Sequence, residues 1–456
     1  MHFSKCVNLI LLEMWFQRQG LFYARRTRLG RDELWEEPMT DQTPILRDYE
    51  LSDRYTRTEG RVFLTGTQAI LRIALDQARR DKAAGLDTRG FISGYRGSPV
   101  GGIDLEVSRN RALVEAEGIG FVPAVNEELA ATQIIGTQQV ETDPDRTCAG
   151  VFGLWYGKGP GVDRAADALK HGNAYGSSPH GGVLVVAGDD HGCVSSSMPH
   201  QSDVAFMNFF MPTINPANVA EFLSFAEWGY ALSRFSGMWV GFKAISETVE
   251  SGMSFELPKP RSFAAPDYEP PKSGLHYRWP DLPGPQIEER MEAKKAAVLA
   301  FARANPIDRS AWGHDAHFGI VTTGKSHLDV LEALRLLGID EARAAEIGLD
   351  IYKVGMVWPL EHEGALAPGD GQRALVLQPP SLLVALAHHA LRLLAGEVVE
   401  ILLELAFDDA PLLFYDQQFA LAPGEGQRAL VLQRPDHADL VDVEADLGGA
   451  RLVDAQ

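Results

Sequence analysis

Cysteine is scarce in this sequence: Cys6, Cys148 and Cys193 are its only three among 456 residues. They are too few and too scattered to form a disulfide framework. No CxxC pair occurs, so the chain shows neither the spacing of a structural zinc site nor a local motif for an iron–sulfur cluster. A reducing cytoplasm is therefore the expected compartment.

Positive charge and long apolar runs are also lacking. The 42 Lys and Arg residues face 62 Asp and Glu residues, a net charge of −20, which argues against nucleic acid or an anionic membrane as a partner. The apolar stretch CVNLILLEMW near the amino terminus is too short to span a membrane and carries Glu13. A basic run without a small-residue cleavage site follows it, so residues 1–45 are expected to be a poorly ordered leader or translation from upstream of the true start.

Alternating helical and strand patterns begin at about residue 61. With 45% hydrophobic residues the chain can bury a large core, and its length suggests two or three domains. The strand patterns are uninterrupted apolar runs, TRGFISG, CAGVFGLWYG, GGVLVVAG and MWVGFKAI, separated by helical segments. Such strands indicate a mostly parallel sheet with helices on both faces, so residues 46–256 are predicted to form an α/β domain.

Three further segments follow this domain. Residues 257–286 are dense in proline and predict an extended linker, and residues 287–366 repeat the α/β pattern in a second domain. In the tail, residues 367–456, the segment LAPGDGQRALVLQ (366–378) recurs as LAPGEGQRALVLQ (421–433). A single near-identical repeat is not the drifted periodicity of a solenoid, and we assign the tail no function.

Three strand-to-helix loops of the first domain carry reactive side chains. They are ISGYRGSPVGGID with Arg96, Gly97 and Ser98, LWYGKGPGVDR with Lys158, and VVAGDDHGCVSSS with Asp189, Asp190 and His191. Each loop alone could be ordinary turn chemistry. Parallel α/β sheets bind ligands where strands end and helices begin, so three such loops in one domain favour a ligand site. Asp189, Asp190, His191 and His200 lack any recognised metal-ligand spacing, and no metal site is assigned.

The stretch AVNEELAATQIIG, residues 124–136, predicts an amphipathic helix with a carboxylate on its apolar side. On a helical wheel Glu127 lies near the middle of the arc formed by Ala130, Ala131, Ile134 and Ile135, whereas Glu128 lies at its edge. One interpretation is structural, with Asn126 as N-cap and both carboxylates favouring the helix dipole. The other is functional, because a desolvated carboxylate can share a proton with a ligand nitrogen, as activation of an aminopyrimidine requires.

Several of these segments together resemble one family. The segments DYELSDRYTRTEGRVFLTGTQAI, GYRGSPVGGID, VNEELAATQIIGTQ, GLWYGKGPGVDR, GDDHGC and IYKVGMVWPLE are similar, in this order, to the long fused form of indolepyruvate ferredoxin oxidoreductase. The resemblance runs from about residue 47 to residue 366. It implies a pyrimidine-binding thiamine diphosphate domain over 46–256 and a transketolase C-terminal-like domain over 287–366.

The resemblance also implies roles for particular residues. Glu127 occupies the position of the glutamate that activates the aminopyrimidine of thiamine diphosphate, with Gly97, Asp190 and His191 near the cofactor. Ser98, followed by Pro99, matches the pair whose hydroxyl helps to hold the substrate carboxylate. The settings of Arg96 and Lys158 favour substrate contacts. The implied reaction is oxidative decarboxylation of a 2-oxoacid such as indolepyruvate, with ferredoxin as electron acceptor and coenzyme A as acyl acceptor.

Other parts of such an enzyme are not found in the sequence. The family's diphosphate-binding motif, GDG followed by a downstream Asn, is incomplete, because Gly369-Asp370-Gly371 occurs but no Asn follows Asn305. Mg²⁺ and [4Fe-4S] clusters are therefore expected on a missing segment or a partner chain. The chain is expected to be inactive by itself and to work in an oligomer.

Two alternatives remain open at this point. The segment GIVTTGKS (319–326) matches the P-loop pattern, although its β-forming residues predict a strand where a phosphate loop needs small residues. The chain could also be a non-catalytic homologue that scaffolds its partners.

Overall fold

The computed structural model describes residues 49–193, 196–278, 280–281, 284–313, 316, 318–361, 373–376 and 430–431. The predicted leader, residues 1–45, lies outside them. The described chain opens with α2 (Asp53–Thr56), and β1 (Arg61–Thr65) pairs antiparallel with β8 (Gly252–Glu256). Helix α3 (Gly66–Ala83) follows β1, and Thr65 caps its amino terminus with a capping box.

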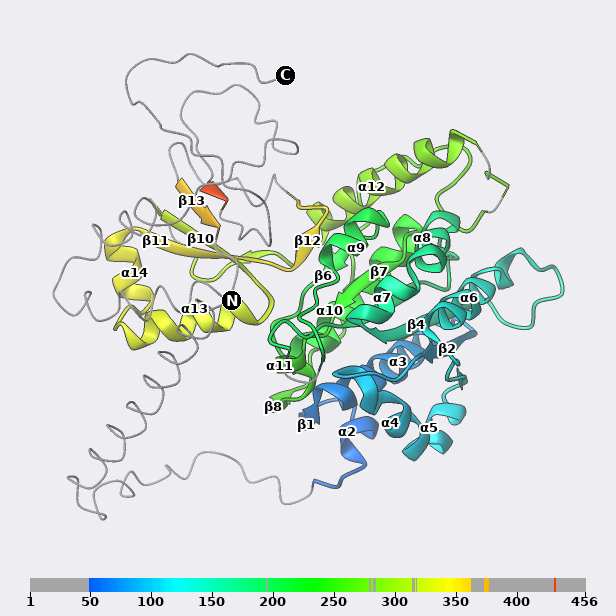
Figure 1. The fold of residues 1–456 in the computed structure, drawn as a ribbon, viewed down its shortest axis with the longest axis horizontal. Coiled ribbons are helices and arrows are strands. Elements are labelled where there is room, and N and C mark those ends of the chain that lie inside the picture. Colours follow the sequence, from blue (N-terminus) through cyan, green and yellow to red (C-terminus); the bar gives the residue numbers. More distant parts are fainter. Residues whose placement is uncertain are drawn as a thin grey trace, which may run out of the picture. The chain divides into compact units, whose positions relative to one another are not determined.

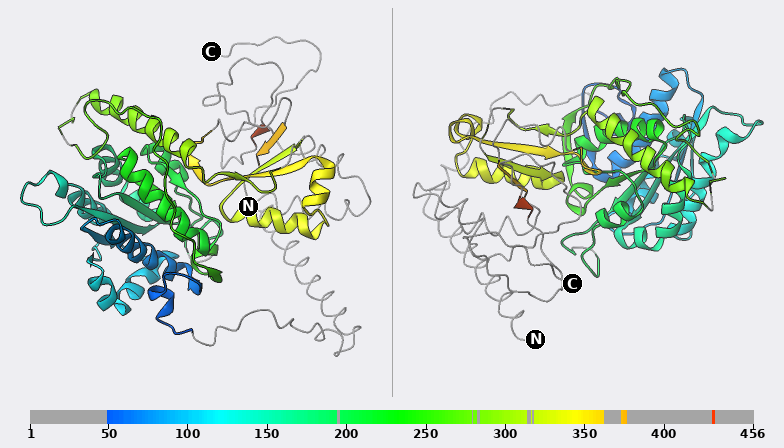
Figure 2. Two further views of the ribbon diagram at one scale, coloured as in Figure 1. Left: turned by 180° about the vertical axis from the view of Figure 1, so that it is seen from behind. Right: turned by 90° about the horizontal axis from the view of Figure 1, so that it is seen from above.

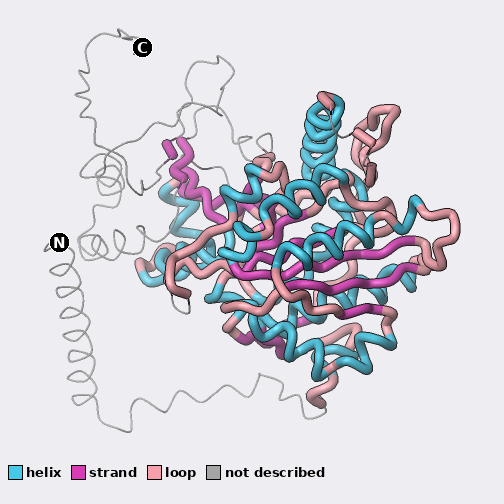
Figure 3. The backbone as a smooth tube through the Cα atoms, turned by 45° about the vertical axis from the view of Figure 1, so that its right-hand side comes forward, coloured by secondary structure: helices cyan, strands magenta, loops and turns pink. Residues whose placement is uncertain are grey.

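The larger sheet has seven strands in the order β12-β6-β7-β5-β4-β2-β3. Its parallel members are β2 (Thr88–Gly94), β3 (Ile119–Phe121), β4 (Gly150–Lys158), β5 (Val183–Gly188), β6 (Thr213–Ile214) and β7 (Val240–Lys243). The edge strand β12 (Met356–Trp358) is antiparallel. Strands β4 and β5 are buried along nearly their whole length, as the uninterrupted apolar runs predict, and the strands lie side by side in Figure 3.

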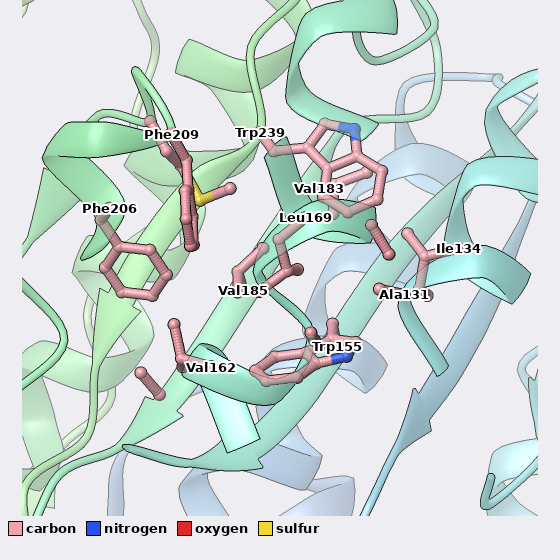
Figure 4. Close-up of a cluster of buried hydrophobic side chains, with 14 of the residues drawn as sticks. Ala131, Ile134, Trp155, Val162, Leu169, Val183, Val185, Phe206, Phe209 and Trp239 are labelled. Atoms are coloured by element: carbon pink, nitrogen blue, oxygen red, sulfur yellow. The ribbon is translucent and has the colours of Figure 1, made fainter. Parts of the chain in front are cut away.

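Helices cover both faces of this sheet. On one face the hydrophobic core joins β4 and β5 to α6 (Glu127–Gln138), α7 (Gly159–Arg164), α8 (Ala166–Tyr175) and α9 (Asp203–Asn208), around Trp155, Leu169 and Phe206 (Figure 4). On the other face, α10 (Val219–Ser236) packs its Tyr230 against Phe152 of β4. Phe152 and Trp155 thus serve opposite faces, as alternation along a strand requires.

Short helices complete the first domain. They are η1 (Val100–Gly102), α4 (Ile103–Arg109), α5 (Arg111–Ala116), η2 (Val140–Thr142) and α11 (Ser246–Val249).

The second sheet has the order β14-β13-β10-β11-β9. Strands β10 (Phe318–Thr323) and β11 (Leu349–Val354) are parallel, and β9 (Arg309–Ser310) runs antiparallel to β11. Helices α13 (Gly324–Leu336) and α14 (Glu341–Ile347) bury Val330, Leu334 and Ala344 against this sheet. Both helices and strand β11 are yellow in Figure 2, whereas β13 is orange and β14 is red. The α/β fold with a mostly parallel sheet followed by a second α/β unit is confirmed.

The proline-rich segment packs differently from an extended linker. Its Ala264 exchanges hydrogen bonds with the side chain of Asn305, and His276 Nε2 lies 2.6 Å from the carbonyl oxygen of Arg234 in α10. Helix α12 (Gln286–Ala304), which the sequence places in the second domain, packs its Phe301 edge-to-face against Trp228 of α10. Figure 1 labels both helices. Periodicity shows that a helix has an apolar face, but it does not show which element covers that face.

The second sheet also continues past residue 366, the boundary expected from the sequence. Strand β13 (Arg373–Val376) pairs parallel with β10, and β14 (Leu430–Val431) pairs parallel with β13. Leu375 pairs with Leu430 and Val376 with Val431, so the two copies of the repeat meet at equivalent positions. The rest of the tail lies outside the described residues.

Candidate active site

The three strand-to-helix loops that carry reactive side chains lie at one edge of the larger sheet. Strands β2, β4 and β5 are adjacent and parallel, so the segments that follow them leave the sheet on the same side. A Cβ on Gly97 would come within 2.6 Å of Cδ of Lys158, and one on Gly188 within 3.1 Å of Pro99. The loop after β2 therefore contacts both of its neighbours through glycine backbone.

Glu127 points inward, as the helical wheel predicts. It is 4% exposed at the first position of α6, while Glu128 beside it is exposed. Asn126 is the N-cap and accepts a hydrogen bond from the amide of Leu129 at 2.8 Å. The indole N–H of Trp155 donates to the carbonyl oxygen of Glu127 at 3.0 Å, which anchors the start of the helix to β4.

The Glu127 carboxylate lies against α7. A Cβ on Gly161 would be 2.7 Å from both Cγ and Oε1 of Glu127, so only glycine leaves room for this side chain. Arg164 Nε lies 3.7 Å from Oε2, and this is the only ion pair of Glu127 within the described part of the chain. The arrangement leaves a buried carboxylate with unused hydrogen-bonding capacity beside the sheet edge.

The residues expected to contact substrate lie around this edge. Arg96 is exposed, whereas Ser98 and Lys158 are half-buried. Lys158 is the N-cap residue of α7, and its aliphatic stem packs on Gly97. The structure thus brings Lys158, at the end of β4, against Gly97 of the loop that also carries Arg96 and Ser98.

The loop after β5 places its charged residues in different surroundings. Asp190 is 1% exposed, and one of its carboxylate oxygens accepts a hydrogen bond from Ser246 Oγ at 3.4 Å, whereas His191 is exposed. Asp189 is fully buried and accepts hydrogen bonds from the amide and hydroxyl of Ser202 at 2.8 and 2.7 Å. Burial opposes its ionisation, but His200, Lys243 and Ser202 outweigh this and lower the pKa of Asp189.

Sequence inspection missed three partners in this site. His200 was considered only as a metal ligand, yet its Nε2 lies 2.8 Å from Asp163 and its Nδ1 lies 3.6 Å from Asp189. The two carboxylates, Asp189 first, raise the pKa of His200 to about 8 against the opposing effect of burial. Arg164 and Gly161 lie in GPGVDR, the end of the segment LWYGKGPGVDR. Its glycines are the only feature of the sequence that indicates close packing of another group against this backbone.

The structure contradicts a P-loop at residues 319–326. Strand β10 continues through Thr323, and α13 begins at Gly324 without an intervening loop, so no phosphate cradle exists there. Lys325 pairs instead with Asp329 one helical turn later, at 2.6 Å.

The described residues contain no group of three or more His, Cys, Asp or Glu that could hold a metal ion. Gly369-Asp370-Gly371 lies outside them. None of the described helices is long and apolar enough to cross a membrane.

Comparisons with known proteins agree with this geometry. A family model described as the indolepyruvate oxidoreductase domain matches residues 309–376. The indolepyruvate oxidoreductase subunit IorA of Pyrococcus horikoshii is 25% identical over 304 residues, which cover 63% of this chain and 41% of that protein. IorA of Pyrococcus abyssi is 25% identical over 296 residues, with the same coverage.

A solved structure shows the same fold. The 2-oxoglutarate:ferredoxin oxidoreductase from Magnetococcus marinus, with 2-oxoglutarate, coenzyme A and succinyl-CoA bound, aligns with a TM-score of 0.50 at 16% identity. The alignment covers 73% of this chain and 60% of that one. Residues 309–376 thus match the indolepyruvate oxidoreductase domain, and the chain is similar to proteins of the indolepyruvate/2-oxoacid:ferredoxin oxidoreductase family.

The chain spans about two fifths, 41%, of the length of the IorA relatives. The matched domain, 309–376, takes in β9 to β11 and β13. The matched domain therefore extends past residue 366, where the sequence pattern places the end of the second domain.

Proposed function

We propose that this chain supplies the aminopyrimidine-binding part of a thiamine diphosphate site in a 2-oxoacid oxidoreductase. The observation that carries the proposal is the buried Glu127, whose carboxylate packs on Gly161 of α7, the helix that follows β4 at the sheet edge of the three loops. A carboxylate in such a place can form a hydrogen bond with a ring nitrogen and hold a proton between the two atoms.

The residues around Glu127 suit this ligand. Gly161 leaves room for the Glu127 carboxylate, and Trp155 fixes the backbone from which the side chain projects. Thiamine diphosphate, when bound, supplies the carbanion chemistry by which a 2-oxoacid loses carbon dioxide. Glu127 would orient the pyrimidine and exchange a proton with its ring nitrogen.

Arg96, Ser98 and Lys158 would hold the substrate carboxylate. A guanidinium, a hydroxyl and an ammonium are suitable donors for a carboxylate, and all three side chains belong to segments at the same sheet edge. Gly97, Asp190 and His191 would border the cofactor. An aryl pyruvate such as indolepyruvate is the substrate that the names of the IorA relatives suggest.

The complete reaction requires components from a partner chain or segment. A diphosphate-binding domain would bring Mg²⁺, and [4Fe-4S] clusters would pass the two electrons of the oxidation to ferredoxin, while coenzyme A takes the acyl group. The working enzyme would be an oligomer in the cytoplasm, and this chain would be inactive alone. The Magnetococcus enzyme, whose structure has coenzyme A and succinyl-CoA bound, supports this assignment of the acyl acceptor.

Glu127 and Glu128 provide a matched test. Thiamine carries the aminopyrimidine without the diphosphate, so its binding to the full chain can be measured by isothermal titration calorimetry. Loss of a charge-assisted hydrogen bond costs about 1.5–3 kcal/mol, so Glu127→Gln should weaken thiamine binding by about 10- to 100-fold. Glu128→Gln, at an exposed neighbouring position, should leave binding unchanged.

Equal affinity of wild type and Glu127→Gln would show that Glu127 has no role in pyrimidine binding. Failure of all three proteins to bind thiamine would favour the alternative of a non-catalytic homologue that scaffolds its partners.

A further inference from the structure

Hydrogen bonds join the two ends of the loop that follows β5. The amide of His200 donates to the carbonyl oxygen of Asp190 at 3.2 Å, and Ser202 donates its amide and hydroxyl to the carboxylate of Asp189. These hydrogen bonds fix the backbone of His200 next to the end of β5.

From this position the imidazole of His200 reaches α7. Its Nε2 lies 2.8 Å from Oδ2 of Asp163, whereas its Nδ1 lies 3.6 Å from Oδ1 of Asp189, a charge contact longer than a hydrogen bond. The ring rests on the backbone of Gly159, where a Cβ would lie only 2.1 Å from Nδ1. Two carboxylates on opposite sides of one ring are best matched by an imidazolium, because only that form carries N–H on both nitrogens.

The surrounding charges also favour the imidazolium. Asp163 faces His200 from α7, Asp189 from the end of β5, and Lys243 of β7 lies 3.8 Å from Asp189. Lys243 also pairs with Asp203 of α9 at 2.5 Å. If His200 were neutral, Lys243 would be the single cation in this group, which has the three carboxylates just named. This balance agrees with the pKa of His200, which is raised to about 8.

The same short helix also contacts Glu127. Gly161 lies against the Glu127 side chain, and Arg164 faces its carboxylate at 3.7 Å. Asp163, which pairs with His200, lies between them in the sequence. Any displacement of α7 from the end of β5 would therefore also change the contact between Gly161 and Glu127.

We propose that the His200 imidazolium is a positioning residue that fastens α7 to the end of β5 and so sets the place of Gly161 against Glu127. This inference relies on the proposed function only for its consequence for cofactor binding. The fastening itself is a property of Asp163, His200 and Asp189, and it can be measured without any ligand.

Hydrogen exchange of the α7 amides in the full chain, followed by mass spectrometry between about pH 6 and about pH 10, tests the proposal. In wild type, protection of α7 should fall as His200 loses its proton near pH 8. A ring whose pKa rises from 6.5 to about 8 favours the fastened state by about thirtyfold, which is the largest loss of protection expected.

His200→Gln keeps a hydrogen-bond donor for Asp163 but cannot become charged. Its α7 amides should show low protection at every pH, and comparison with wild type at the same pH cancels the intrinsic pH dependence of exchange. His171→Gln is the control, because His171 is a half-exposed residue of α8 that pairs with Asp167 at 3.3 Å. It should retain the wild-type protection and the wild-type midpoint.

Wild-type protection of α7 in His200→Gln, without a pH-dependent step in either protein, would overturn the proposal. Thiamine titrations of the same variants separate it from the proposed function. His200→Gln should bind thiamine more weakly than His171→Gln near pH 7. If none of the proteins binds thiamine while the pH step of α7 is present, the fastening stands and the proposed function fails.

Discussion

Gly161→Ala should introduce a clash that involves one other side chain. The new Cβ would lie 2.7 Å from Cγ and Oε1 of Glu127 and 3.0 Å from Cδ, where ordinary contacts are 3.4–4 Å. Glu127 is buried and cannot swing into solvent without moving α6 or α7. Overpacking of this kind costs about 1–3 kcal/mol, and the gain from replacing glycine by alanine in a helix returns about 0.5–1 kcal/mol.

Glu127→Ala supplies the second arm of a double-mutant cycle. In that background the atoms that clash are gone, so Gly161→Ala should become stabilising by about 0.5–1 kcal/mol. The coupling free energy between the two positions should therefore be about 1–3 kcal/mol, measured by urea unfolding monitored by circular dichroism. Gly161→Ala alone should also weaken thiamine binding, because it displaces the carboxylate.

Gly136 is the control on the same region of the fold. It is exposed in α6, and a Cβ there would meet nothing within 4 Å, so Gly136→Ala should stabilise the protein in either background by about 0.5–1 kcal/mol. Additivity of Gly161→Ala and Glu127→Ala would show that the close packing of α7 on Glu127 does not exist in solution.

Two further expectations concern buried charges of the second sheet and its junction with α10. Lys353 is fully buried and ion-paired with Glu221, so Lys353→Met should lower the free energy of unfolding by about 3 kcal/mol in urea denaturation, because among the described residues only the exposed Arg309 remains to pair with Glu221. A loss below about 0.5 kcal/mol would contradict the burial of this pair. Burial, with the charges of Lys353 and Arg309, lowers the pKa of His327 to about 4. Between about pH 6.5 and about pH 4, His327 is therefore protonated in the unfolded chain but not in the native state. Stability should fall from about pH 6.5 toward pH 4, and His327→Gln should flatten this part of the stability curve; an unchanged slope would show that His327 titrates normally.

The family resemblance and the fold class could be predicted from the sequence, because the patterns that carry them are local. Uninterrupted apolar strands predict a parallel sheet, and Asn126 followed by Glu127 marks the start of α6. The inward orientation of Glu127 follows from a spacing of 3.6 residues per turn. The β-forming residues of GIVTTGKS likewise predicted the strand that excludes a P-loop.

Other features depend on contacts between residues far apart in the chain. No local pattern places His200 next to Asp163, Gly161 against Glu127, or α12 on α10 instead of on the second sheet. Helical periodicity identifies an apolar face but is the same whichever surface covers that face.

Propensities and caps are properties of a few neighbouring residues, so the sequence shows where elements begin, which faces are apolar and which loops carry reactive groups. The partner of each side chain follows from strand order and helix packing, which bring together residues separated by tens of positions. For this chain the acid at the sheet edge could be named from sequence. The contacts of the short helix α7 with both Glu127 and His200 depend on the tertiary structure, because they form only where the parallel strands lie side by side.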